Sequence, residues 1–135
     1  MYQTANSAPT SPILNLPENN SLFTDNLTLV FDWSNSTDTE GNAISYYLEI
    51  WNDTTQTNIM YVNSSISETA NTTNDIVNFN NESKDYYWRV LAFDSSSNSS
   101  WSDLRNVSLY QTPQPTPLTN ITIWLDDRTS DSKYE

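Results

Sequence analysis

Three segments of this chain place an apolar side chain at every second position, and this spacing restricts its fold more than any other feature. The apolar members of these segments are Leu27, Leu29, Phe31 and Trp33, then Ile44, Tyr46, Leu48 and Ile50, then Tyr86, Trp88, Val90 and Ala92. Because successive side chains of a β-strand point to opposite faces, a period of two predicts strands with one face in a shared core. Shorter segments at 13–16, 59–62, 76–79 and 107–110 are predicted as further strands.

The number and spacing of these strands predict the fold class. No window carries the apolar spacing and cap of a helix, and turn-rich clusters separate the strands. We therefore expect an all-β sandwich. The predicted division is a flexible leader at 1–12, one sandwich at 13–112, a stiff Pro-rich linker at 113–118 and a C-terminal strand segment at 119–135.

The composition excludes several classes of function. The chain has no Cys and no His, so thiolate or imidazole metal sites and the commonest catalytic bases are missing. A net charge of −12 opposes binding to nucleic acid or to anionic membranes. No apolar run approaches the length of a membrane span, and residues 1–12 lack the features of a secretory leader. The chain is interpreted as a mature protein or an excised fragment.

Acceptor triplets for N-glycosylation are about twice as frequent as the composition predicts. With 18 Asn and 36 Ser plus Thr in 135 residues, roughly five N-x-[ST] triplets are expected by chance. The chain has ten, beginning at Asn19, Asn26, Asn35, Asn52, Asn63, Asn71, Asn81, Asn98, Asn106 and Asn120. We expect covalent N-glycans and an extracellular or cell-surface location. The alternative is that Asn, Ser and Thr only serve turns and strand edges.

The strand sequences resemble a known family. LTLVFDW, ISYYLEIW and DYYWRVLAFD, followed by SSWSD, are similar to the second, third, sixth and seventh strands of fibronectin type III domains. The resemblance covers about residues 13 to 112 and implies a seven-stranded immunoglobulin-like sandwich with Trp33 in its core. It also implies that Tyr86 is a tyrosine-corner residue whose hydroxyl caps the preceding loop. The composition resembles modules of archaeal surface glycoproteins, whereas a long loop at 63–74 and a single Gly depart from the family.

A turn between two predicted strands is a weak candidate for a metal site. Asp38, Glu40 and Asn42 surround Gly41, and this pattern resembles the calcium-binding turns of cadherin-like sandwiches. Ca²⁺ takes six to eight oxygen ligands, whereas only three side chains are available here. The alternative is a loop stabilised by Asx turns, and no other cofactor is expected.

The outward face of two predicted strands is unusually apolar and is a candidate interface. It consists of Tyr47, Trp51, Tyr87, Leu91 and Phe93, with Glu49 and Arg89 expected to pair across neighbouring strands. We expect a second subunit, an adjoining module or the segment 121–125 to cover it. The alternatives are a sugar-binding platform on Tyr47, Trp51 and Tyr87, or packing by glycans and loops. Arg89 and Trp101 also resemble the arginine and tryptophan ladder of cytokine-receptor sandwiches.

The C-terminal segment is predicted to form one more strand. It contains Ile121, Thr122, Ile123, Trp124 and Leu125, and a lone strand is not stable. It starts the next module, docks on its own domain, or adds to the sheet of a neighbour as a donor strand.

These features predict a structural module without enzymatic activity, in an S-layer, stalk or filament. Its partners are other copies of itself or neighbouring modules. An adhesion or carbohydrate-binding module and an accessory domain of a secreted hydrolase are the alternatives. Nothing in the sequence fixes two of the carboxylates Asp32, Glu49, Asp94 and Asp103 across a cleft at the separation that glycoside hydrolysis needs, so they are expected to be solvated charges.

Overall fold

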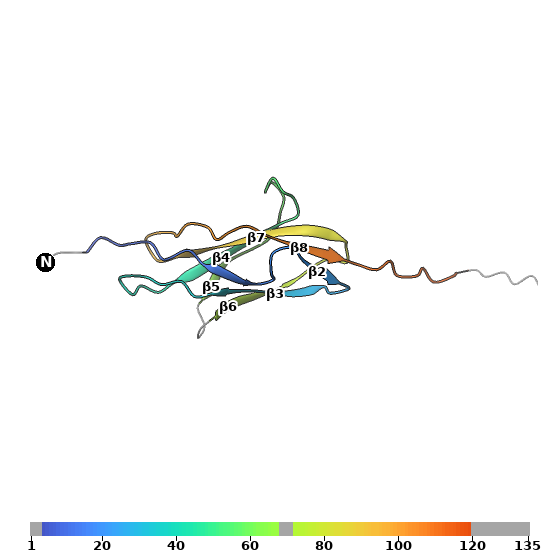
Figure 1. Cartoon of the computed structure of the whole chain (residues 1–135), viewed down its shortest axis with the longest axis horizontal. Helices are drawn as coiled ribbons and strands as arrows, with labels where there is room; N and C mark the ends of the chain where they lie inside the picture. The colour runs from blue at the N-terminus through green and yellow to red at the C-terminus, as the bar shows by residue number, and fades with distance from the viewer. Residues whose placement is uncertain (1–3, 68–71, 120–135) are drawn as a thin grey trace, which may run out of the picture.

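The computed structural model describes residues 4–67 and 72–119, and these residues form a two-layered β-sandwich (Figure 1). The eight strands are β1 (Ile13–Leu16), β2 (Ser21–Thr24), β3 (Thr28–Ser34), β4 (Ser45–Trp51), β5 (Ile59–Ser67), β6 (Thr72–Asn78), β7 (Lys84–Phe93) and β8 (Arg105–Tyr110). One sheet has the order β1-β3-β6 and the other β2-β8-β7-β4-β5. Every pairing is antiparallel except that of β2 with β8. The described residues contain no helix, as the sequence predicts.

The core lies where the period of two places it. Trp33, Tyr46 and Trp88 are completely buried, one each from β3, β4 and β7. The Trp33 and Tyr46 rings meet edge to face with centroids 5.6 Å apart, and Phe31 meets Trp88 in the same way at 4.9 Å. Edge-to-face pairs add about 0.5–1.5 kcal/mol beyond the area that they bury. The apolar alternation is therefore confirmed as the origin of the core.

Two strand predictions were wrong in extent. β5 continues to Ser67 and β6 begins at Thr72, so most of the long loop predicted at 63–74 is strand. These extensions are rich in Asn, Ser and Thr, and backbone pairing with β4 and β3 holds them extended without apolar alternation. Leu27 was predicted to point into the core but is 40 % exposed, because it precedes the first residue of β3.

A strand that the sequence did not predict changes the topology. β2 leaves the sheet of β1 and pairs in parallel with β8, with Ser21 opposite Val107 and Thr24 opposite Tyr110. The described residues thus form eight strands, one more than the seven expected. The predicted C-terminal strand lies outside the described residues.

The tyrosine-corner prediction holds for the ring of Tyr86 and not for its hydroxyl. The Tyr86 ring is completely buried and packs on Phe79 with centroids 4.6 Å apart. Its hydroxyl has no hydrogen-bond partner among the described residues, and burial, followed by the nearby Glu82 charge, raises the Tyr86 pKa. The hydroxyl of Tyr46 has the capping role instead, since it accepts the backbone N–H of Ser36 at 2.6 Å.

The two ends of the described chain leave the sandwich at opposite ends of its long axis (Figure 1). At one end, residues of the predicted leader bind the sandwich: Asn6 Nδ2 donates to Asp94 Oδ2 at 2.9 Å, and the Ser7 hydroxyl donates to Glu40 at 3.0 Å. Pro9 and Pro12 are buried, so this part of the leader belongs to the folded structure. At the other end, residues 112–119 are exposed and extend away from β8.

Candidate functional site

The candidate interface on the outer face of β4 and β7 is built from pairs of residues that lie directly opposite each other. Tyr47 faces Leu91, Trp51 faces Tyr87, and Ser45 faces Phe93. Glu49 lies opposite Arg89, and the guanidinium donates from Nη2 to Glu49 Oε2 at 3.3 Å. The cross-strand ion pair predicted from the sequence is therefore confirmed.

Arg89 also lies between two tryptophan rings. Its guanidinium carbon is 3.9 Å from the ring centroid of Trp101 and 4.8 Å from that of Trp51. Trp101 in turn meets Tyr47 edge to face at 5.8 Å. A guanidinium over an indole face is attracted by the ring quadrupole. The resemblance to an arginine and tryptophan ladder is confirmed in this geometry.

The loop that carries Trp101 is fastened to β7 by serine hydroxyls. The Ser99 hydroxyl accepts the backbone N–H of Ala92 at 3.0 Å, and the Ser102 hydroxyl accepts that of Val90 at 2.9 Å. The backbone N–H groups of the same two serines donate to the carbonyls of Ala92 and Val90. These four bonds satisfy the part of the β7 edge that extends beyond β8, so Trp101 is held firmly above Arg89.

Asp94 organises the start of this loop. Its carboxylate accepts the side chain of Asn6 and the backbone N–H groups of Ser96 and Ser97. The hydrogen bond from Asn6 is the largest of several that lower the Asp94 pKa to about 2. Hydrogen bonds that favour the charged form of a carboxyl have this effect. Asp94 thus connects the leader to the loop, and its role is structural.

This packing determines which of the predicted interface residues are accessible. Trp51 is only 2 % exposed and Arg89 lies against its ring, so the platform of Tyr47, Trp51 and Tyr87 is not open for a sugar to stack on. Tyr47, Tyr87, Leu91 and Phe93 are partly buried, and Trp101 of the chain's own loop packs against Tyr47. Burial, more than the neighbouring Glu49 charge, raises the Tyr47 pKa. The remaining predicted interface residues, Ile121, Ile123, Trp124 and Leu125, lie outside the described residues.

Three carboxylate oxygens of the candidate calcium turn already accept hydrogen bonds from protein donors. Asp38 Oδ1 accepts the backbone N–H groups of Glu40 and Asn42, at 3.0 and 2.9 Å, as an Asx turn does. The Glu40 carboxylate accepts from Ser7, and Asn42 donates its side-chain amide to Asn6. Asp38 Oδ2 is buried without a partner among the described residues, but one carboxylate oxygen does not fit an ion that needs six to eight. The three side chains do not fit a calcium site.

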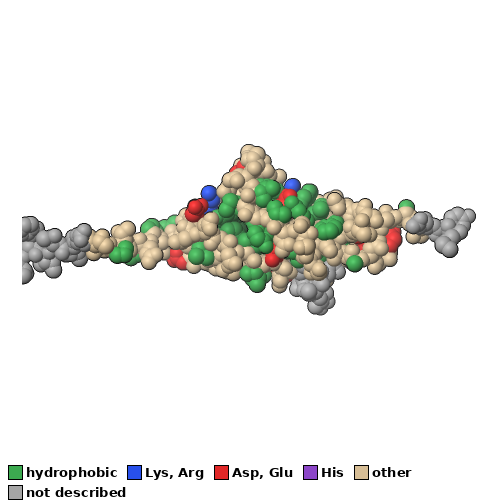
Figure 2. Space-filling view, turned by 180° about the vertical axis from the view of Figure 1, so that it is seen from behind, with side chains coloured by type: hydrophobic (Ala, Val, Ile, Leu, Met, Phe, Trp, Pro, Cys, Tyr) green, Lys and Arg blue, Asp and Glu red, His purple; other side chains and the backbone are tan. Residues whose placement is uncertain are grey.

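None of the eight glycosylation acceptors within the described residues is fully buried. Asn19, Asn81 and Asn98 are exposed, and Asn26, Asn35, Asn52, Asn63 and Asn106 are partly exposed. Asn71 and Asn120 lie outside the described residues. On the face shown in Figure 2, uncharged polar side chains and backbone cover most of the surface, which suits such groups, and apolar side chains gather in patches between them. Glycosylation of these residues remains a prediction.

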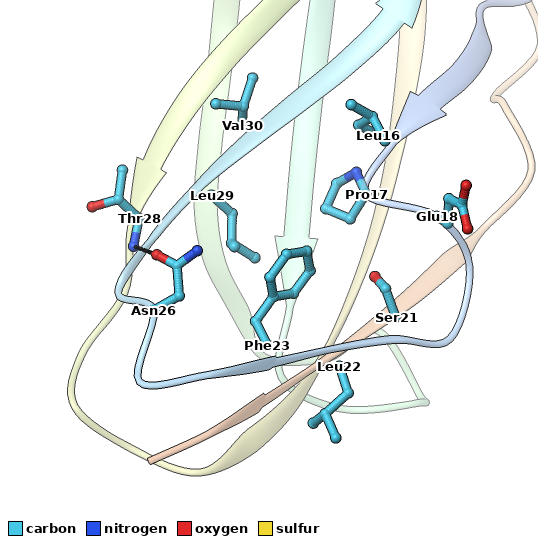
Figure 3. Close-up of a pocket in the computed structure, with 10 residues that line it drawn as sticks. All are labelled: Leu16, Pro17, Glu18, Ser21, Leu22, Phe23, Asn26, Thr28, Leu29 and Val30. Atoms are coloured by element: carbon cyan, nitrogen blue, oxygen red, sulfur yellow. Dashed lines mark hydrogen bonds between the residues drawn. The ribbon is translucent and has the colours of Figure 1, made fainter. Parts of the chain in front are cut away.

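A groove that the sequence pattern does not predict lies between β2 and β3 (Figure 3). It has a volume of about 500 Å³. Its lining residues are Leu16, Pro17, Glu18, Ser21, Leu22, Phe23, Asn26, Thr28, Leu29 and Val30. Phe23 and Leu29 point into it from the two sheets. The signal in the sequence was Pro17, because a proline removes a ladder donor and marks the end of a paired strand.

The strand order and the buried aromatic core define an immunoglobulin-like sandwich of the fibronectin type III kind. No protein-family model matches the chain, and no curated protein matches it. Solved structures do match. The chain is similar to the FN1-FN3 domains of chicken CNTN1, with 15 % identity and a TM-score of 0.54 over 80 % of this chain and 35 % of that one. It is similar to astrotactin-2, with 18 % identity and a TM-score of 0.50 over 78 % of this chain and 22 % of that one.

A third match is the fibronectin type-III domain of human fibronectin type III domain containing protein 3. It has 19 % identity and a TM-score of 0.46 over 86 % of this chain and 96 % of that one. The chain therefore spans about a third or less of the CNTN1 and astrotactin-2 structures, and at these identities the likeness concerns the fold. Within residues 4–67 and 72–119 no helix is long and apolar enough to cross a membrane.

Proposed function

We propose that this chain is a structural module of a glycosylated cell-surface or extracellular assembly, such as a filament, stalk or S-layer, without enzymatic activity. The observation that carries the proposal is the placement of the leader and the linker at opposite ends of the long axis (Figure 1). Modules connected in this way follow one another in a line, and a Pro-rich linker acts as a semi-rigid spacer between them.

The chemistry of the surface supports this role. Ten acceptor triplets in 135 residues, eight of them at accessible positions, would give the module a hydrated coat of N-glycans. The carboxylates with lowered pKa values are engaged in loops. Asp94 binds the leader, and Asp53 accepts hydrogen bonds mainly from Thr57 and Thr55, which lower its pKa to about 2. A module of this kind needs no cofactor.

The comparisons support the same class of protein. The matched CNTN1 structure contains several such domains, and astrotactin-2 is described as a membrane protein involved in neuronal development. We infer that the partners of this chain are other copies of itself or adjoining modules, together with covalent glycans. A carbohydrate-binding role through Tyr47, Trp51 and Tyr87 is not proposed, because Trp51 is buried.

Intact mass spectrometry and electron microscopy of natively sourced protein test the proposal. The mass should exceed the 15.5 kDa of the bare chain by several glycans, and glycopeptides should map to the acceptor triplets. Asn74 and Asn78 are exposed but lie outside such triplets, so they serve as internal controls that should stay bare. Microscopy should show regular fibres or lattices. Bare asparagines together with dispersed single particles would contradict the proposal.

A further inference from the structure

Half of β3 has no strand beside it on one edge. β3 pairs with β6 along its whole length, from Thr28 to Ser34. On the other edge β1 pairs only with the last three residues of β3, and the pairing ends at Leu16 opposite Asp32. The chain then crosses at Pro17 to the other sheet, where β2 joins β8. Among the described residues, the edge of β3 from Thr28 to Phe31 therefore has no strand partner, although the Thr28 N–H donates to Asn26 Oδ1 at 3.0 Å.

The opposite side of the sandwich differs from this open edge, because side-chain hydrogen bonds connect the two sheets there. There the Asp75 carboxylate of β6 accepts the Tyr61 hydroxyl at 2.9 Å and the Asn63 amide at 3.0 Å, both from β5. These bonds tie the two sheets together. The side formed by β2 and β3 is left open instead, and the groove of about 500 Å³ occupies it (Figure 3).

The groove offers what an added strand needs. An unpaired strand edge presents N–H and C=O groups to a new backbone, and apolar pockets beside it accept alternate side chains. Here the large apolar side chains around the groove are accessible: Leu22 is 66 % exposed, Leu16 52 % and Val30 44 %. Glu18 is the only charged residue in the lining.

The chain itself carries a segment that fits this groove. Residues 121–125 place Ile121, Ile123 and Leu125 on one side of an extended strand and carry no charge. Two chains of net charge −12 repel each other, so a contact between copies is most favourable where both surfaces are neutral. The segment carries no charge and the groove lining only one, on Glu18, so the two surfaces come close to this condition.

The linker extends away from the sandwich of its own chain. Thr112 is fastened to Asp25, because its backbone N–H donates to Asp25 Oδ1 at 2.8 Å and its hydroxyl lies 2.9 Å from the same oxygen. From there Pro113, Pro115 and Pro117 restrict the backbone to extended conformations, and residues 112–119 extend away from the sandwich (Figure 1). The seven residues from Pro113 to Thr119 span about 22 Å in this form, which is enough to reach a neighbouring molecule.

We propose that the groove between β2 and β3 binds residues 121–125 of a second copy of this chain, which pair as an added strand with the free edge of β3. The proposal rests on the proposed function as an assembling module and names the contact that joins the copies. The exit of the linker beside Asp25 lies at the same end of the sandwich as the open residues of β3.

The test uses the full chain produced without glycans and two variants that each remove one half of the contact. Ile123→Asp places a charge in the donated segment, and Val30→Asp places one at the rim of the groove. Size-exclusion chromatography with light scattering should show assembly of the unchanged chain above 15.5 kDa and monomers of either variant. An equimolar mixture of the two variants should form a heterodimer, because one supplies an intact segment and the other an intact groove.

Ile76→Asp is the matched control. Ile76 lies directly opposite Val30 on β6 and is 59 % exposed, but it does not line the groove. This variant should assemble like the unchanged chain. Far-ultraviolet circular dichroism checks that all variants are folded.

A labelled peptide with the sequence of residues 119–126, TNITIWLD, tests the groove without relying on assembly. It should bind the Ile123→Asp chain and bind at least tenfold more weakly when Val30→Asp is added. If the variants assemble as well as the unchanged chain, the proposed contact is wrong. The proposed function as an assembling module is not affected by that result. If the unchanged chain is a monomer that does not bind the peptide whereas the Ile123→Asp chain binds it, the segment occupies the groove of its own chain. Binding of the segment to a second copy is then refuted. A monomer that fails to bind the peptide in any form refutes the groove as a strand acceptor, and the native mass and microscopy still decide the proposed function.

Discussion

Replacing Arg89 by Ala should destabilise the sandwich by about 3 kcal/mol. The change removes two contacts of the guanidinium, with Trp101 at 3.9 Å and Trp51 at 4.8 Å, which contribute about 0.5–1 kcal/mol each. It also leaves the carboxylate of Glu49, whose side chain is only 11 % exposed, without its cation at 3.3 Å. An unpaired buried polar group costs about 1–3 kcal/mol, and more when it is charged.

The free energy of unfolding from urea titration measures this effect. Lys84→Ala is the control, because Lys84 and Glu82 form an ion pair at a similar distance, 3.4 Å, with both side chains exposed. That change should cost less than about 0.5 kcal/mol. In the Arg89→Ala chain, Glu49→Gln should recover at least about 1 kcal/mol, since it removes the unpaired charge. If Arg89→Ala costs no more than Lys84→Ala, Arg89 does not hold this face together and the reasoning fails.

Two further changes test the loop that carries Trp101. The pKa of Asp94 is about 2 in the folded chain, below its ordinary value of 3.8. The charged carboxylate therefore stabilises the folded chain fully above about pH 4, and this stabilisation disappears as the pH falls toward 2. Carboxyl NMR titration should show this midpoint, and Asn6→Ala should raise it; an unchanged midpoint would rule out the leader as the cause. Ser102→Ala should cost about 1–3 kcal/mol in urea, because it leaves the buried N–H of Val90 unpaired. The exposed Ser100→Ala should change stability by less than about 0.5 kcal/mol, and equal effects of the two would contradict the assignment.

The core and one surface contact were predictable because short-range patterns in the chain specify them. The period of two places Trp33, Tyr46 and Trp88 on the same side of their strands, and a sandwich has one dry interior to receive them. The pairing of Glu49 with Arg89 followed from the same alternation, since opposite charges at outward positions of neighbouring strands attract.

The candidate site was only partly predictable. The sequence correctly marked the aromatic residues around Arg89, but it treated Trp51 as a surface residue. Trp51 is buried because Arg89 lies against its ring and is itself held from above by Trp101 of a loop about fifty residues later. The strand alternation does not show that the loop carrying Trp101 folds over this face, because that loop lies outside the strands.

The sequence by itself determined which side of each main strand faces the interior, because side-chain alternation is a property of the extended backbone. The tertiary structure alone decided where β1 ends, that β2 crosses to pair in parallel with β8, and that the edge of β3 from Thr28 to Phe31 is left open. Strand pairing joins backbone groups, which are the same in every residue except proline. Which edge receives a partner therefore depends on the arrangement of the whole sandwich, and the groove exists only at that level.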